Sequence, residues 1–116
     1  MAWQELVPPS AELSLKTSGV VEWNTALQVL LGNPKWVGLV WDSSSRWLGI
    51  HRRDQDAGFP VYCEPESGEF RIDSADALNA VGVSVASNHA ASPTEWTNDG
   101  SYRPHGRPSV FFVTIP

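Results

Sequence analysis

The chain has 116 residues, of which 41% are hydrophobic and 18% are charged, with a formal net charge of −5. This composition fits one folded domain, excludes a disordered chain, and disfavours broad nucleic-acid binding because an acidic protein repels phosphates. Cys63 is the only cysteine, which excludes an intrachain disulfide and favours a reducing, cytoplasmic setting.

The chain begins with an arm, a hairpin and a helix. Residues 1–11 are expected to form a loose arm, because two adjacent prolines prevent a helix. Alternating apolar residues predict a strand at 12–16 and a returning strand at 20–23. Asn24 then stands at the N-cap position of a short helix, which Gly32 is placed to end.

A second hairpin is predicted directly after this helix. Residues 35–42 and 46–51 both read as strands, and a run of three serines between them predicts the turn. The first of these strands is apolar on both faces, so we expect it to be buried on both sides. Gly38 and Gly49 favour one of three features: a close approach to the backbone, a bulge or a coil in the sheet. Residues 12–53 therefore read as a hairpin-helix-hairpin unit.

The second half of the domain, residues 59–86 and 109–115, echoes the first. Turn, strand, polar cap, short helix and glycine stop follow one another from Ser18 to Gly32, and again from Ser67 to Gly82. The two copies share no reactive group, so the echo indicates a repeated way of folding and no duplicated active site. Whether the copies pair within one chain or between two chains stays open.

The elements of this second half are short. Strands are predicted at 59–64 and 69–72, and Asp73 or Ser74 is expected to cap the second helix. A β-branched and aromatic strand closes the chain at 109–115.

Residues 87–108 are polar and are expected to form one long loop, with a tight hairpin as the alternative inside it: Asn98-Asp99-Gly100 is a candidate turn between short strands at 95–97 and 101–103. A loop of this length in a compact domain is usually either functional or disordered. It is the candidate surface for a ligand or partner, and its candidate residues are Trp96, Tyr102, Arg103, His105 and Arg107.

Six tryptophans are more large rings than a small monomer readily covers. We therefore expect some of them to lie at an interface, and we expect a homodimer. The candidate interface residues are Trp36, Trp41 and Trp47. Core packing is the alternative for Trp23, Trp36 and Trp41, which alternate with other apolar residues.

Four basic residues are the candidates for nucleic-acid contact: Lys16, Arg46, Arg52 and Arg53. The three arginines form a cluster in and after one predicted strand, and clustered arginines often contact phosphates. Neighbouring aspartates favour a solvated strand end instead.

Catalytic and metal-binding motifs are weak in this sequence. Cys63 lies in an apolar strand, where a small buried residue is the simpler interpretation. The spacing of Cys63, His51, His89 and His105 matches no standard set of metal ligands. We assign no catalytic residue, metal or cofactor, and we expect neither an enzyme nor a membrane protein, because no run approaches the roughly 18 apolar residues of a spanning helix.

Four stretches between residues 13 and 53 follow the order hairpin, short helix ending in Leu-Gly, and second hairpin. They are Leu-Ser-Leu-Lys-Thr-Ser-Gly-Val-Val-Glu-Trp-Asn, Ala-Leu-Gln-Val-Leu-Leu-Gly, Val-Gly-Leu-Val-Trp-Asp and Trp-Leu-Gly-Ile-His-Arg. This order resembles the swapped-hairpin domain of AbrB/SpoVT-type transcription regulators. The resemblance implies an interleaved homodimeric β-barrel, or a chain that carries both halves of a pseudo-symmetric barrel.

The DNA-contacting residues that the resemblance implies are mostly missing. Family members place a proline where Asn24 stands, and basic residues where this chain has Val20, Gln28 and Val29. Lys16 alone fits the family's basic set. The chain resembles the scaffold without its phosphate-binding face.

These observations predict an α+β, mostly β protein of one domain, residues 1–116, built as a small swapped-hairpin-like barrel with two short helices. We expect a non-enzymatic regulatory or scaffold protein that acts through protein–protein contacts. One alternative is an AbrB-like DNA-binding regulator or antitoxin. Another is a small-molecule-binding or enzymatic barrel that uses the 87–108 loop.

Overall fold

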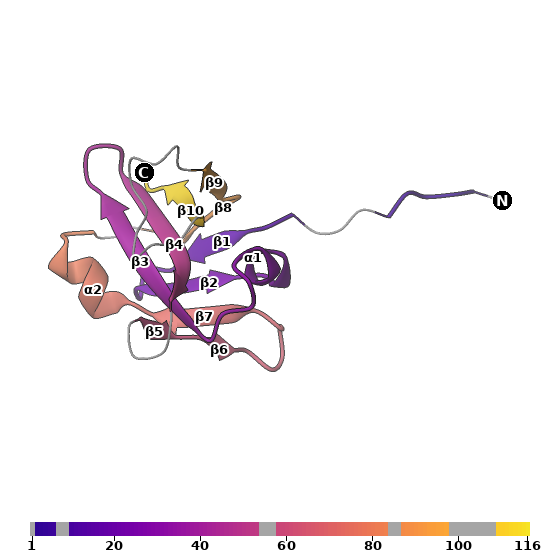
Figure 1. The fold of residues 1–116 in the computed structure, drawn as a ribbon, viewed down its shortest axis with the longest axis horizontal. Coiled ribbons are helices and arrows are strands. Elements are labelled where there is room, and N and C mark those ends of the chain that lie inside the picture. The colour runs from indigo at the N-terminus through magenta and orange to yellow at the C-terminus, as the bar shows by residue number, and fades with distance from the viewer. Residues whose placement is uncertain (1, 7–9, 54–57, 84–86, 98–108) are drawn as a thin grey trace.

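The computed structural model describes residues 2–6, 10–53, 58–83, 87–97 and 109–116 (Figure 1). Across these residues the protein is mostly β, with two antiparallel sheets and two short helices, which confirms the predicted composition of the fold. The strands are β1 Leu13–Leu15, β2 Val20–Trp23, β3 Trp36–Asp42, β4 Trp47–Arg53, β5 Phe59–Pro60, β6 Tyr62–Cys63, β7 Phe70–Asp73, β8 His89–Ala91, β9 Thr94–Thr97 and β10 Ser109–Thr114. The helices are α1 Thr25–Leu30 and α2 Ala75–Ala80. Neither of these two described helices has the length and apolar character needed to cross a membrane.

Two five-stranded sheets enclose one apolar core. The first sheet has the order β6-β7-β2-β1-β8, and the second has the order β5-β3-β4-β10-β9. Figure 1 shows the β3–β4 hairpin lying across the strands of the first sheet. The core residues of the first sheet are Leu13, Leu15, Val21, Trp23 and Ile72, and those of the second are Val37, Leu48, Ile50, Phe111 and Val113. They form one cluster because alternate residues of each strand point to the same face.

The two echoed units pair with each other inside one chain. β2, from the first copy, is hydrogen-bonded antiparallel to β7, from the second. Glu22 lies opposite Arg71 in this pair, and the same two residues hold equivalent places in the two copies. Equivalent residues that face each other across an antiparallel pair are related by a local twofold rotation. The pairing question that the sequence left open is thus answered for these strands.

A second exchange links the copies at the sheet edges. β8 follows α2 but pairs with β1 of the first copy. In the same way, β3 follows α1 but pairs with β5, which leads directly into β6 of the second copy. β8 thus extends the first sheet beside β1, and β3 lies beside β5 in the second sheet.

Two predicted segments differ in the structure. Residues 87–97 belong to the segment expected as a loop, yet they contain β8 and β9. β9 includes the candidate hairpin strand 95–97 but pairs with β10, and residues 98–108 lie outside the described part. The local sequence of β8 and β9 is polar, so the strands depend on pairing with β1 and β10 more than on propensity. The strand expected at 59–64 is divided at Val61, because β5 joins the second sheet and β6 joins the first.

Asn24 caps α1 as predicted. Its side-chain oxygen accepts hydrogen bonds from the backbone N–H of Leu27 and of Glu12, both at 3.1 Å. Its side-chain amide donates to the carbonyl oxygen of Ser10 at 2.7 Å. One side chain thus joins the start of α1 to the chain that enters β1.

Replacing Asn24 by alanine is expected to lower the free energy of unfolding by about 1–2 kcal/mol, because the first turn of α1 loses its acceptor. The matched control is Asn24→Ser, which keeps an acceptor oxygen at the cap position and adds no charge. Urea denaturation of both variants measures the difference. An alanine variant no less stable than the serine variant would contradict this account of the cap.

α2 begins in a different way. The hydroxyl of Ser74 donates to the carbonyl oxygen of Gly19 at 2.8 Å instead of capping its own helix. The carboxylate of Asp73 accepts the N–H of Ala75 at 3.3 Å. The start of the second copy's helix is therefore attached to the hairpin turn of the first copy.

Candidate protein-interaction site

A groove with a volume of about 490 Å³ crosses the β3, β4 and β10 strands of the second sheet. Its apolar lining residues are Val40, Trp41, Trp47, Gly49, Val110 and Phe112, and it also includes the exposed residues Asp42 and Ser43. We refer to this set as the aromatic groove. Apolar lining with a few polar groups is typical of binding sites.

The strand register forms the floor of the aromatic groove. Val40 lies opposite Gly49, and Gly49 lies opposite Phe112, so the three residues make one row across three strands. A Cβ atom at Gly49 would lie 2.7 Å from Val40 Cγ2 and 2.8 Å from Val110 Cγ1. The glycine is needed because its neighbours already fill that space, which confirms the close approach predicted at this position.

Two aromatic rings form one wall. The Trp47 and Phe112 ring centroids are 4.4 Å apart with an interplanar angle of 31°. Both side chains remain partly exposed, although aromatic rings gain most when they are fully buried. The two rings therefore form a rigid apolar surface that is partly exposed to solvent.

A cation contacts Trp41, another residue that lines the groove. The Arg46 guanidinium carbon lies 5.4 Å from the centroid of the Trp41 ring. Arg46 Nε also donates to the carbonyl oxygen of Ile115 at 3.1 Å, and Nη2 contacts that of Pro116 at 3.4 Å. The ring and the end of the chain together hold the positive charge in place.

Asp42 shapes the turn next to the groove. One of its carboxylate oxygens accepts from the Ser44 hydroxyl at 2.7 Å and from the backbone N–H groups of Ser44 and Ser45 at 3.0 and 3.3 Å. The Ser44 hydroxyl, followed by the Ser45 N–H, lowers the pKa of Asp42 below its ordinary value. The carboxylate is thus ionised, and hydrogen-bond donors of the turn already occupy one of its oxygens. This arrangement suits a structural role better than the role of a general base.

The three candidate interface tryptophans are only partly brought together. Trp41 and Trp47 both line the aromatic groove. Trp36 stands at the other end of β3, opposite Arg53, about 16 Å from Trp41 at the rise of a strand. The expectation that β3 is buried on both sides holds at Val37 and Gly38 but is wrong toward the hairpin tip, where the groove leaves the strand half-exposed.

The basic residues are dispersed. Arg46 precedes β4 whereas Arg52 and Arg53 end it, a separation of about 20 Å along the strand. Lys16 belongs to the hairpin of the first sheet, where its ammonium lies 3.9 Å from the Glu22 carboxylate. The cluster of three arginines suggested by the sequence is therefore divided, because Arg46 lies apart from the adjacent Arg52 and Arg53.

Within its described residues, 87–97, the segment 87–108 adjoins the groove through β9, where Thr94 lies opposite Phe112. The backbone of Trp96 in β9 lies opposite Val110, a groove residue. The other candidates of this segment, Tyr102, Arg103, His105 and Arg107, lie outside the described residues. The sequence also did not single out Val40, Val110 and Phe112 for the site, although their alternation within two strands was visible.

The potential metal ligands are placed differently from expectation. Cys63 is exposed on the short edge strand β6, so the interpretation as a buried residue was wrong. His51 is fully buried in β4, where its ring lies close over Gly38. Within the described ranges, no three His, Cys, Asp or Glu side chains gather as a set of metal ligands.

An acidic hollow lies on the first sheet. It is lined in part by Glu12, Glu22 and Glu69. Desolvation raises the pKa of Glu69, and its hydrogen bond with Glu22 and the charge of Glu22 raise it further. Negative charge is therefore concentrated on this sheet, whereas the aromatic groove has Arg46 beside it.

Comparisons with models of protein families, with curated proteins and with solved structures gave no significant match.

Proposed function

We propose that this protein is a small, non-enzymatic regulatory or scaffold protein, and that it acts through protein–protein contacts at the aromatic groove. The observation that carries the proposal is the partly exposed Trp47–Phe112 pair in a groove that Trp41, the ring contacted by Arg46, also lines. Tryptophan and arginine are enriched among the residues that dominate binding energy at protein interfaces. The dispersed positions of Lys16, Arg46, Arg52 and Arg53 are the reason for placing protein contact above DNA binding.

We further propose that the two sheets are the halves of a swapped-hairpin-like barrel that serves as the platform. The support is the reciprocal pairing of β8 with β1 and of β3 with β5, together with the central β2–β7 pair. The resemblance to AbrB/SpoVT-type domains implies such an exchange between two chains. Here the exchange takes place within one chain, so a homodimer would meet through another surface, and the aromatic groove is the surface proposed.

A photo-reactive amino acid in place of Ser43 tests the proposed function. Ser43 is exposed and borders the groove, so the replacement should leave the fold intact. In cells that express the full chain, irradiation is expected to produce covalent adducts with protein, and Trp47→Ala should reduce them. The matched control is the same photo-reactive group at Ser45, which is exposed in the same turn. Adducts with nucleic acid alone, or protein adducts equally abundant from Ser45, would contradict the proposal.

A further inference from the structure

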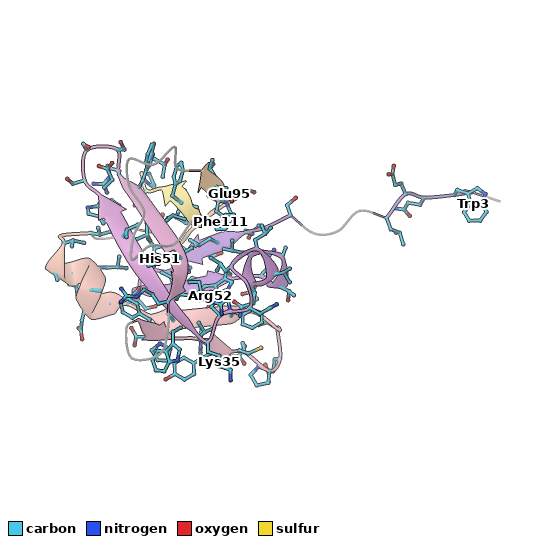
Figure 2. The ribbon with its side chains drawn as sticks, viewed as in Figure 1. Trp3, Lys35, His51, Arg52, Glu95 and Phe111 are labelled. Atoms are coloured by element: carbon cyan, nitrogen blue, oxygen red, sulfur yellow. The ribbon has the colours of Figure 1, made fainter. Side chains whose placement is uncertain are left out.

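The segment before β1 carries two large apolar side chains that contact almost nothing. Trp3 is 91% exposed and Leu6 is 87% exposed. Figure 2 shows Trp3 far from the body of the protein, on an extended segment that runs away from the sheets. We call residues 2–6 the arm. Burying one Trp and one Leu is worth several kcal/mol, so an apolar surface that covered both side chains would bind the arm favourably.

We propose that the arm of one copy binds in the aromatic groove of a second copy, with Trp3 and Leu6 against Trp47 and Phe112. This inference rests on the proposed function, and it names a second copy of this chain as the partner. If each copy gives its arm to the other, the contact is made twice and closes as a twofold dimer.

The arm carries one charged side chain, that of Glu5, between Trp3 and Leu6 in the sequence. At the groove the nearby charges are mixed, because Asp42 is part of the lining and Arg46 contacts the lining residue Trp41. The acidic hollow of the first sheet would instead place Glu5 against three further carboxylates.

The direction of the arm favours a second copy over the same copy. Figure 1 shows the arm leaving the body on the side of α1, whereas the turn between β3 and β4, where the groove lies, is at the opposite side. From Trp3 to Leu13 an extended chain spans at most about 33–36 Å. That length carries the two side chains well beyond their own core and within reach of a neighbouring molecule.

The first test is the oligomeric state of the full chain, measured by sedimentation equilibrium. The wild-type protein is expected to dimerise, and Trp3→Ala/Leu6→Ala should weaken the dimer at least about 30-fold, the effect typical of one lost hot-spot residue. Ser43→Trp, which adds a ring at the exposed mouth of the groove, should weaken it to a similar extent. Two controls should leave the dimer unchanged: Ser45→Trp, and Val29→Ser/Leu30→Ser, which removes exposed apolar groups of α1 that are 58% and 57% exposed.

The second test mixes the two defective proteins. The Trp3→Ala/Leu6→Ala chain has an intact groove, and the Ser43→Trp chain has an intact arm. Neither should associate with itself, but a fluorescently labelled Ser43→Trp chain should bind the arm variant with one-to-one stoichiometry. This cross-binding distinguishes an arm in a groove from two grooves packed face to face.

Two results would overturn the inference: a monomeric wild-type protein, and a dimer that persists in the arm variant. Each is distinguishable from failure of the proposed function. Protein adducts from Ser43 that contain a different protein would support the function while removing the arm as occupant.

Discussion

Replacing Trp23 by alanine is expected to lower the free energy of unfolding by about 3–5 kcal/mol. Trp23 is 1% exposed and stacks on Phe70 with the ring centroids 6.5 Å apart. Its indole N–H donates to the side-chain oxygen of Gln28 at 2.7 Å, and the Gln28 amide donates to the Pro34 carbonyl at 3.1 Å. The substitution therefore leaves both a cavity and a buried oxygen without its donor. Chemical denaturation of the variant measures the loss against a total of about 5–15 kcal/mol for a domain.

Trp23→Phe separates the two effects. The ring remains against Phe70, but the buried Gln28 oxygen loses its donor, at a cost of about 1–3 kcal/mol. In a double-mutant cycle with Gln28→Leu, the double variant should be less destabilised than the sum of the single variants by about 0.5–3 kcal/mol. Strict additivity would show that the hydrogen bond contributes little and that packing alone accounts for Trp23.

The second large effect is expected at Gly19. Its φ is +84°, and a Cβ atom there would lie 2.6 Å from the backbone Cα of Ala75, which cannot move aside as a flexible side chain can. Its carbonyl oxygen also accepts from the N–H and the hydroxyl of Ser74, at 3.1 and 2.8 Å. Left-handed strain of about 1–2 kcal/mol and overpacking of about 1–3 kcal/mol together predict that Gly19→Ala costs about 3 kcal/mol.

The echo provides the matched control for this prediction. Gly68 holds the equivalent turn position in the second copy with φ +71°, but nothing lies within 4 Å of an added Cβ atom. Gly68→Ala should therefore cost only the strain, about 1–2 kcal/mol. Equal losses for the two variants, measured by urea denaturation, would show that the contact between the first hairpin and α2 does not stabilise the fold.

Local patterns in the sequence were sufficient for the elements whose partners are close in the chain. The Asn24 cap depends on contacts within one helical turn, and the β3–β4 hairpin depends on alternation across one short turn. β8 and β9 depend on strands far away in the sequence, β1 and β10, and their own residues carry little strand signal. Cys63 is exposed for a related reason, because the division of the predicted strand places it on a sheet edge.

The candidate site also depends on pairing between strands that are far apart in the sequence, which local patterns do not reveal. Trp41 and Trp47 were recognisable from their residue type, and both line the aromatic groove. Val110 and Phe112 enter it because β10 pairs with β4 in one register, and a shift of one residue would turn them to the opposite face. The dispersal of Arg46 and Arg52 also follows from strand geometry, since residues near in sequence lie far apart along an extended chain.

The pairing of β2 with β7 within one chain affects how this protein responds to dilution and to amino-acid substitution. In a two-chain assembly such a pair weakens as the concentration falls, whereas covalent linkage holds both strands at a fixed, high effective concentration. Covalent linkage also removes the requirement that each paired surface be complementary to an identical copy of itself. Each substitution then alters one side of the molecule instead of two, which allows one half to carry tryptophans and a groove while the other half remains acidic.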